Sequence, residues 1–378
     1  MSLKRNSGFV AQIALVCLFL FQITCGSTFA GNYVVAWNGP GQLSVPAAAT
    51  NVQAIAAGSS ASLALLGDGT VLAWGTTAAT NVPAGLSNVV AIAAGHGQSL
   101  ALKNDGTLVA WGAPTTSATT NIPDGLSNIL AIACGDDHNL VLKSDETIYA
   151  WGANYSGQTN IPAGLSNVVA IAAGNSGNIA VKQDGTVWVS GSTYPTNIIN
   201  GFSNAVGGAL TAGAYQGAVL SGDGTAYAWG FNGLIVSTNA NVIAVTGRSP
   251  INQAGCVLAL RRDGTLTGWG GTYLGQTNVW MNLSNVLAIA SGYGYNMAVV
   301  GNSLPHPVEP ILSASFSNGQ FLITQPTSQG RYYRLEYKNS LTDGWQMLSP
   351  VPGDGGRQIL VDPNPPVSHR FYHVYGGQ

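Results

Sequence analysis

The stretch Val89-Val-Ala-Ile-Ala-Ala-Gly95 is followed by Ser99-Leu-Ala-Leu-Lys103, a turn at Asp105-Gly-Thr107, and Leu108-Val-Ala-Trp-Gly112. Asp-Gly between two short apolar runs is a strong hairpin signal, because glycine adopts positive φ without steric cost. Both faces of the first run are apolar, so that strand needs cover on both sides. This unit therefore predicts short antiparallel strands stacked between other sheets.

The unit recurs with a period of about 40 residues, which is typical of propeller blades or helical arrays. The recurring hairpins favour blades, and the repeated Trp-Gly ends occur at Trp37, Trp74, Trp111, Trp151, Ser190 (a degenerate copy), Trp229 and Trp269. The last unit, from Leu287 to Val300, lacks its Trp-Gly strand, whereas a lone copy of that strand stands at Tyr33–Trp37. A closed ring uses both fragments, because the first strand completes the last sheet and removes the open edges. We therefore predict an all-β fold, a seven-bladed β-propeller closed by an N-terminal strand.

These motifs resemble the regulator of chromosome condensation repeat. Ala150-Trp-Gly-Ala-Asn-Tyr-Ser-Gly-Gln-Thr-Asn-Ile-Pro162 is similar to the second half of that repeat, and the resemblance covers about residues 33–303. It implies a seven-bladed propeller with an N-terminal closing strand. Tyr33–Trp37 and Gly275-Gln-Thr-Asn-Val279 also resemble secreted bacterial members, the type II β-lactamase inhibitory proteins. Their aromatic-rich binding loops differ from the loops of this chain, so that resemblance concerns the scaffold.

The ends of the chain predict further segments. Lys4 and Arg5, an apolar run from Phe9 to Phe21, and a polar stretch ending at Ala30 have the layout of a secretory signal that is too short to span a membrane. The predicted organisation is a signal peptide at 1–30, the propeller at 31–303, a Pro-rich linker at 304–310 and a small antiparallel β domain at 311–378. The last segment resembles fibronectin-like or immunoglobulin-like sandwich domains. We expect a secreted, periplasmic or cell-surface bacterial protein.

Charge excludes one class of partner. The chain has 15 acidic and 13 basic residues, and charged residues are only 7% of its composition. Removal of Lys4 and Arg5 with the signal makes the remainder more acidic. A mildly acidic propeller lacks the basic surface that nucleic acids require. We therefore expect no nucleic-acid partner, and we expect a monomer.

Few residues of the chain suggest catalytic chemistry. The aspartates of the Asp-Gly turns are expected to form turns, and the repeated Trp residues are expected to fill the core. Asp136-Asp137-His138 contains metal-ligand types, but adjacent ligands without partners elsewhere do not predict a metal site, and His138 is expected to form hydrogen bonds to backbone at a turn. We predict no catalytic residues, no metal and no cofactor, hence a protein that is not an enzyme.

Aromatic residues that the repeat does not require predict a binding surface. In four-stranded antiparallel blades, the loops after Ala-x-Gly and after Trp-Gly share one face, and the Asp-Gly turns occupy the other. Aromatics on rigid loops act as interface anchors. The candidates on the first face are Tyr155, Tyr194, Phe231 and Tyr273 after Trp-Gly, and Tyr215, Tyr293 and Tyr295 after Ala-x-Gly.

Three functions fit these features. The first is a secreted, non-enzymatic propeller that binds another protein through its aromatic face. The second is a carbohydrate-binding module, since tyrosines with Asn and Thr can stack on sugars and form hydrogen bonds with them. The third is an enzyme with a site at the mouth of the central channel, which inward-facing carboxylates or a bound metal would favour.

Overall fold

The structure is a computed structural model that describes residues 31–37, 44–76, 78–113, 119–190, 202, 204–213, 216–230, 233–236, 241–247, 256–270, 283–301, 313–317, 320–326, 332–338, 346–347, 351–352, 357–362 and 371–377. The chain divides into two compact units, with a boundary between Ser303 and Leu304. No helix among these residues has the length and apolar character needed to cross a membrane.

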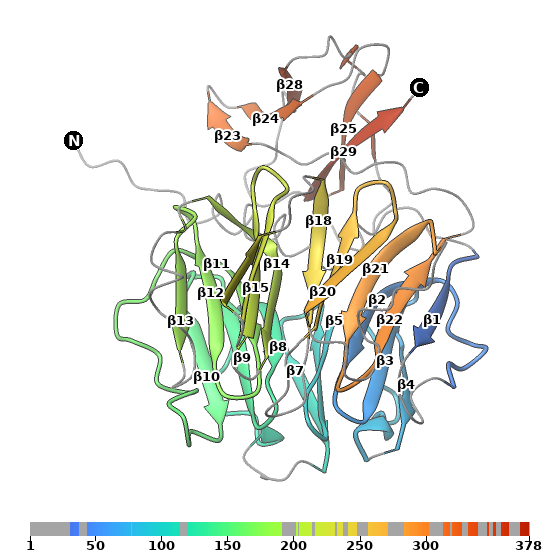
Figure 1. Cartoon of the computed structure of the whole chain (residues 1–378), viewed down its shortest axis with the longest axis vertical. Helices are drawn as coiled ribbons and strands as arrows, with labels where there is room; N and C mark the ends of the chain where they lie inside the picture. Colours follow the sequence, from blue (N-terminus) through green and yellow to red (C-terminus); the bar gives the residue numbers. More distant parts are fainter. Residues whose placement is uncertain are drawn as a thin grey trace. The chain divides into compact units, whose positions relative to one another are not determined.

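The first unit consists of antiparallel sheets, one for each predicted repeat (Figure 1). Three of them follow in chain order: β2 (Val52–Ala57), β3 (Ala61–Leu66) and β4 (Val71–Gly75); β5 (Val89–Ala94), β6 (Gln98–Lys103) and β7 (Leu108–Gly112); β8 (Ile129–Cys134), β9 (His138–Lys143) and β10 (Ile148–Gly152). The next three are β11 (Val168–Ala173), β12 (Asn178–Lys182) and β13 (Val187–Ser190); β14 (Ala205–Gly213), β15 (Gln216–Ser221), β16 (Ala226–Gly230) and β17 (Gly233–Val236); β18 (Val242–Thr246), β19 (Cys256–Arg261) and β20 (Leu266–Gly270).

The N-terminal strand closes the ring, as predicted. β1 (Tyr33–Trp37) pairs antiparallel with β22 (Asn296–Val300), which pairs with β21 (Val286–Ser291), so the sheet order is β1-β22-β21. Figure 1 shows β1 beside β22, although they come from opposite ends of the propeller sequence. Successive sheets contact one another, and β2 of the first sheet contacts β21 and β22 of the last. This cycle of contacts makes the unit a closed propeller.

Core side chains lie between neighbouring sheets, as the apolar character of both strand faces predicted. One cluster joins Leu63 and Leu65 of the first sheet to Ala101 and Trp111 of the next. Another joins Met297 of the last sheet to Ala64 and Trp74 of the first, across the closure. The repeated tryptophans are core residues, and those buried are Trp37, Trp74, Trp111, Trp151 and Trp229.

Among the described residues of the first unit, the expected four-stranded blade is seen in the sheet of β14–β17, whereas the other sheets have three strands. The returning segments of the first three repeats contain Pro83, Pro123 and Pro162, and proline has no N–H for a strand ladder. The first returning segment begins with the short 3-10 helix η1 (Ala78–Thr80), and apolar residues such as Val82 and Leu86 still pack onto the core.

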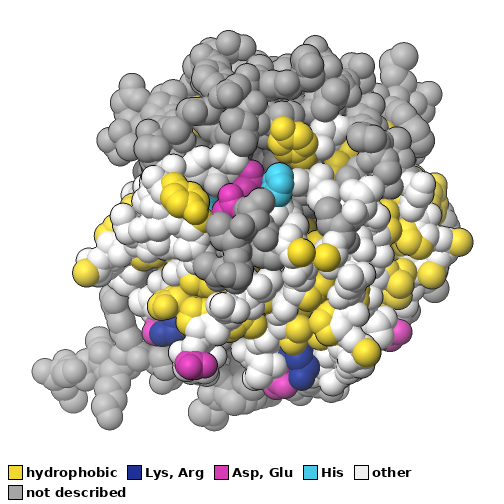
Figure 2. All heavy atoms as spheres, turned by 90° about the horizontal axis from the view of Figure 1, so that it is seen from below, with side chains coloured by type: hydrophobic (Ala, Val, Ile, Leu, Met, Phe, Trp, Pro, Cys, Tyr) yellow, Lys and Arg dark blue, Asp and Glu magenta, His cyan; other side chains and the backbone are white. Residues whose placement is uncertain are grey.

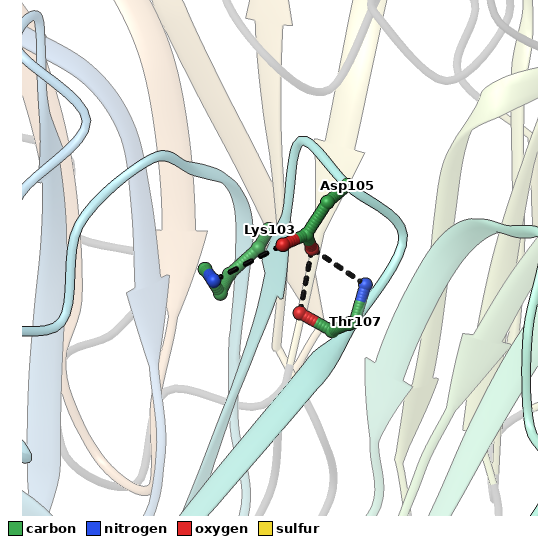
Figure 3. Close-up of polar contacts among 3 residues, drawn as sticks. All are labelled: Lys103, Asp105 and Thr107. Carbon is green, nitrogen blue, oxygen red and sulfur yellow. Dashed lines mark hydrogen bonds and ion pairs between the residues drawn. The ribbon is translucent and has the colours of Figure 1, made fainter.

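The Asp-Gly turns have the predicted structural role. In the turn at Asp105, the carboxylate accepts hydrogen bonds from the Thr107 backbone N–H at 3.0 Å and the Thr107 hydroxyl at 2.6 Å, and it pairs with Lys103 at 3.1 Å (Figure 3). Asp68, Asp145, Asp184 and Asp263 accept the same two bonds from the threonine two residues on.

The second unit is also all-β. One sheet has β23 (Ser313–Ser317), β24 (Gln320–Pro326) and β28 (Arg357–Asp362), and the other has β25 (Tyr332–Lys338), β26 (Gln346–Met347), β27 (Val351–Pro352) and β29 (Phe371–Gly377). Antiparallel pairing throughout agrees with the alternating pattern of this part of the sequence.

Candidate functional site

The small-residue strands all finish at one end of the propeller, which we call the loop end. There the backbone of four described loops donates a hydrogen bond to the neighbouring sheet or its loop. Ser59 N donates to Gly95 O at 3.1 Å, Asp136 N donates to Gly174 O at 3.1 Å, and Tyr293 N donates to Gly58 O at 3.2 Å across the closure. These bonds hold neighbouring loops in fixed positions around the axis.

The close packing of neighbouring sheets requires glycine at these strand ends, because a Cβ would clash with the next backbone. A Cβ on Gly58 would lie 2.5 Å from Gly95 O, one on Gly135 would lie 2.5 Å from Gly174 O, and one on Gly292 would lie 2.6 Å from Gly58 O. None of these three has positive φ. The repeated Ala-x-Gly thus permits the backbones of adjacent sheets to approach closely.

The loops after Trp-Gly lie at this same end, as predicted. Ala153 N donates to Asp137 O at 2.7 Å, and Thr76 N donates to Ser60 O at 2.9 Å. Each bond joins the loop after a Trp-Gly strand to the loop after the small-residue strand of the same sheet. The two sets of loops therefore form one surface.

The side chains of the loop end are mainly polar and uncharged. The described loops after Ala-x-Gly contribute Ser59, Ser60, His96, Asp136, Asp137, Asn175, Ser176 and Tyr293. Every described Lys and Arg in residues 31–301 lies instead at or next to an Asp-Gly turn or the equivalent Asp145-Glu146 turn, at the opposite end: Lys103, Lys143, Lys182, Arg261 and Arg262. Figure 2 shows one face of the molecule, where charged side chains form a few small groups among uncharged atoms. Long-range electrostatic attraction is therefore a minor source of affinity at the loop end.

Tyr155 is the most prominent described side chain of this surface, with 83% of its area exposed. Its loop is held by its own hydrogen bonds: Thr159 N donates to Asn154 Oδ1 at 3.0 Å, Asn154 Nδ2 donates to Asn160 Oδ1 at 2.9 Å, and Ser156 N donates to Gln158 Oε1 at 2.7 Å. An exposed aromatic ring on a loop ordered in this way loses little conformational entropy on binding. Tyr155 thus has the properties of an interface anchor.

Of the two described tyrosines after Ala-x-Gly, one is exposed and one is buried. Tyr293 is 38% exposed at the loop end. The prediction that Tyr295 belongs to the binding surface is wrong, because its side chain is fully buried. Its hydroxyl lies 2.9 Å from Ser62 Oγ and donates to Ala61 O at 3.1 Å, so it joins the last sheet to the first.

The burial of Tyr295 follows from its place in the repeat. It is three residues after Gly292, as His138 is after Gly135 and Gln98 is after Gly95. Gln98 Nε2 donates to Gly135 O at 3.2 Å, and His138 Nε2 lies 2.6 Å from Asn178 Oδ1, each reaching the next sheet. His138 thus contacts a side chain of the next sheet, in addition to any turn role expected from the sequence. Alignment of the repeats would have identified Tyr295 as a connector between sheets.

The remaining predicted residues, Tyr194, Tyr215, Phe231 and Tyr273, lie outside the described residues. Sequence reasoning also missed buried polar residues that shape the loop end. Asn178 is fully buried, and its Nδ2 donates to Gln158 O at 2.6 Å and to Ser190 Oγ at 2.9 Å. Ser99 and Asn139 occupy the same repeat position and donate to Ala79 O and Thr119 O. The regular recurrence of Ser or Asn four residues after the glycine is the signal that could have revealed them.

The carboxylates of the turn end are structural. The Thr107 hydroxyl and backbone N–H, followed by Lys103, lower the pKa of Asp105 to about 2. The hydroxyl and N–H of Thr70 likewise lower the pKa of Asp68. Among the described residues, no group of three or more His, Cys, Asp or Glu side chains is arranged to hold a metal ion.

Comparison with known proteins gives a match to two of the repeats. The family model for the regulator of chromosome condensation (RCC1) repeat matches residues 52–76 and 129–158. These segments include β2 to β4 in one case and β8 to the Tyr155 loop in the other. No curated protein matches the chain.

Solved structures share the fold at low sequence identity. The structure of Prp20p from Saccharomyces cerevisiae, described with its binding to Gsp1p and histones, is 15% identical with a TM-score of 0.58, over 75% of this chain and 94% of that one. Yeast RCC1 (Prp20) bound to Kap60 is 17% identical with a TM-score of 0.60, over 80% and 95%. The receptor kinase CR4 ectodomain of Physcomitrella patens is 19% identical with a TM-score of 0.51, over 64% and 74%.

Proposed function

Because the chain is a β-propeller that carries regulator of chromosome condensation repeats, we propose that it is a non-enzymatic binding protein that docks another protein on its loop end. The observation that carries the proposal is Tyr155, whose ring is 83% exposed on a loop that is ordered before any partner arrives. Tyrosine supplies a large contact area at low entropic cost and is frequent among interface hot spots. Tyr293 adds a second exposed ring at the same end.

The proposed docking mode relies on aromatic contact and hydrogen bonding. The loop end offers hydroxyls and amides from Ser59, Ser60, Asn175 and Ser176. Contacts of this kind give specificity through geometry, whereas charge pairs mainly accelerate association. Binding is therefore expected to depend weakly on ionic strength.

A carbohydrate is the second candidate ligand, favoured by the immediate neighbours of Tyr155. Between Asn154 and Asn160, the residues on either side of the ring are polar or glycine, including Ser156 and Thr159. An isolated ring among hydroxyls and amides suits stacking on a sugar with hydrogen bonds to its hydroxyls.

Differential capture of ligands by the full-length protein tests the proposal. Tyr155→Ser should lose a protein that wild type captures, while Tyr149→Ser should retain it, because Tyr149 is 42% exposed on the outer strand β10. Equal capture by wild type and Tyr155→Ser would contradict docking at this loop. Binding to a glycan array that is lost only in Tyr155→Ser would indicate that the ligand is a carbohydrate and not a protein.

Export is the second part of the proposal. It is supported by the signal-like composition of residues 1–30 and by the start of β1 at Tyr33, just after the predicted cleavage site. Mass spectrometry of the protein from its source should find an N-terminus at Gly31. A mature chain that retains Lys4 and Arg5 would contradict export by this route.

A further inference from the structure

The loop that carries Tyr155 is connected to the neighbouring sheet by a chain of buried side chains. His138, at the start of β9, contacts Asn178 at the start of β12, and Asn178 Nδ2 donates to Gln158 O in the Tyr155 loop. Gln158 is only 4% exposed, and its Oε1 accepts a bond from Ser156 N, next to Tyr155. The chain of bonds thus leaves one sheet, enters the next and returns to the loop of the first.

We propose that Asn178 is the positioning residue of the Tyr155 loop, so that the contact between these two sheets sets how the tyrosine is presented to a partner. Asn178 does not touch the exposed surface, since it is fully buried. It acts through Gln158, whose backbone oxygen it holds at 2.6 Å. For its effect on binding, the inference rests on the proposed function of the loop end.

Three features favour Asn178, and not its neighbours, as the positioning residue of the Tyr155 loop. Its amide is fully used, because Nδ2 donates to Gln158 O and Ser190 Oγ while Oδ1 lies 2.6 Å from His138 Nε2. The orientation of the amide is therefore fixed by its surroundings. Gln158 in turn fixes Ser156 through its side chain, whereas Thr159 and Gly157 are fixed by Asn154. Loss of Asn178 removes a buried bond that ties Gln158 O to the adjacent sheet.

The repeat supplies a matched control. Asn139 occupies the equivalent position one sheet earlier, is 1% exposed, and donates through Nδ2 to Thr119 O at 2.7 Å. Removing its side chain deletes a similar buried amide without touching Gln158. Asn139→Ala should therefore cost similar stability while leaving the Tyr155 loop in place.

Amide hydrogen exchange of the full-length protein measures the positioning directly, because exchange reports local opening. In Asn178→Ala, the amide of Ser156, which is held by Gln158, should exchange about tenfold faster than in wild type, the effect of losing one buried hydrogen bond. Asn139→Ala should leave the Ser156 amide unchanged. Unchanged exchange in Asn178→Ala, or equal acceleration in both variants, would overturn the inference.

Asn178→Asp separates loop positioning from folding. The substitution keeps the size of the side chain and an acceptor for His138, but it places an oxygen instead of an N–H against Gln158 O. It should accelerate exchange in the Tyr155 loop even if Asn178→Ala does not fold. The capture assay is a separate readout: faster exchange with unchanged capture would keep the positioning role and contradict docking at Tyr155. Lost capture in Tyr155→Ser, together with unchanged exchange in Asn178→Ala, would keep docking at Tyr155 and contradict the positioning role of Asn178.

Discussion

Replacement of Gly58 by alanine tests the close approach of adjacent sheets. Gly58 has no positive φ, so the substitution would ordinarily stabilise the protein by about 0.4–1 kcal/mol through the unfolded chain. Here the new Cβ would lie 2.5 Å from Gly95 O, 3.1 Å from Ala61 O and 3.2 Å from Ala94 Cβ. Two of these atoms belong to the backbone and cannot rotate away, so the sheets must separate.

The size of the effect follows from two terms. Overpacking of a tight interior costs about 1–3 kcal/mol. Separation of the sheets also weakens the bond from Ser59 N to Gly95 O, now 3.1 Å, and such a bond contributes about 0.5–1.5 kcal/mol. After subtraction of the entropic gain, Gly58→Ala should destabilise the full-length protein by about 1–3 kcal/mol.

Urea unfolding of wild type, Gly58→Ala and Gly222→Ala provides the assay. Gly222 is the control because it also lacks positive φ, its nearest neighbours are the side chains of Asn204 and Val206 at 3.1 and 3.4 Å, and other repeats carry Asn104 or Ser144 in its place. Gly222→Ala should lie within about 0.5 kcal/mol of wild type. If Gly58→Ala proves as stable as wild type or more stable, the steric explanation of the Ala-x-Gly motif is refuted.

Three further predictions follow from the same structure. Asn32→Ala should destabilise the protein by about 1–3 kcal/mol, because the Asn32 side chain is 1% exposed, donates to Val52 O at 2.8 Å and accepts from Val52 N at 2.7 Å. Urea unfolding measures the loss of stability, and an unchanged stability would contradict a role for Asn32 in closing the ring. The pKa of Asp105 falls from 3.8 to about 2 on folding and those of Asp68, Asp145, Asp184, Asp223 and Asp263 are also lowered, so stability should be fully present above about pH 4 and decline as the pH falls toward 2. Thermal unfolding from pH 7 to 2 checks this sign, and Asp105→Asn should reduce the decline. Tyr295→Phe should lower the melting temperature without changing ligand capture, because the Tyr295 hydroxyl forms hydrogen bonds with Ala61 O and Ser62 Oγ inside the ring. Lost capture with unchanged stability would indicate that Tyr295 belongs to the binding surface after all.

The sequence predicts the fold well because the same turn, glycine and Trp-Gly positions recur in successive repeats. The isolated Tyr33–Trp37 strand and the incomplete last unit together require a ring, and β1 indeed pairs with β22. The three-stranded sheets could not be predicted from apolar periodicity, because it does not show that the prolines of the returning segments lack the N–H that a fourth strand would need.

The candidate site was harder to predict because exposure depends on the neighbouring sheet. Tyr293 and Tyr295 are two residues apart in one loop, yet one is exposed and the other is enclosed by Ala61 and Ser62, far away in sequence. Asn178 was missed for the same reason, since its partners come from two different sheets. Aligning the repeats by their glycines places each such residue at its structural position.

Oxidative footprinting of tyrosines in the full-length protein, with and without a captured ligand, tests the central claim most directly. Without ligand, Tyr155 at 83% exposure should be modified readily, and Tyr295 at 0% should be protected. The ligand should protect Tyr155 and Tyr293 and leave Tyr33 and Tyr149, on the outer strands β1 and β10, unchanged. Protection of Tyr33 or Tyr149 with Tyr155 still reactive would place the interface elsewhere and contradict binding at the loop end.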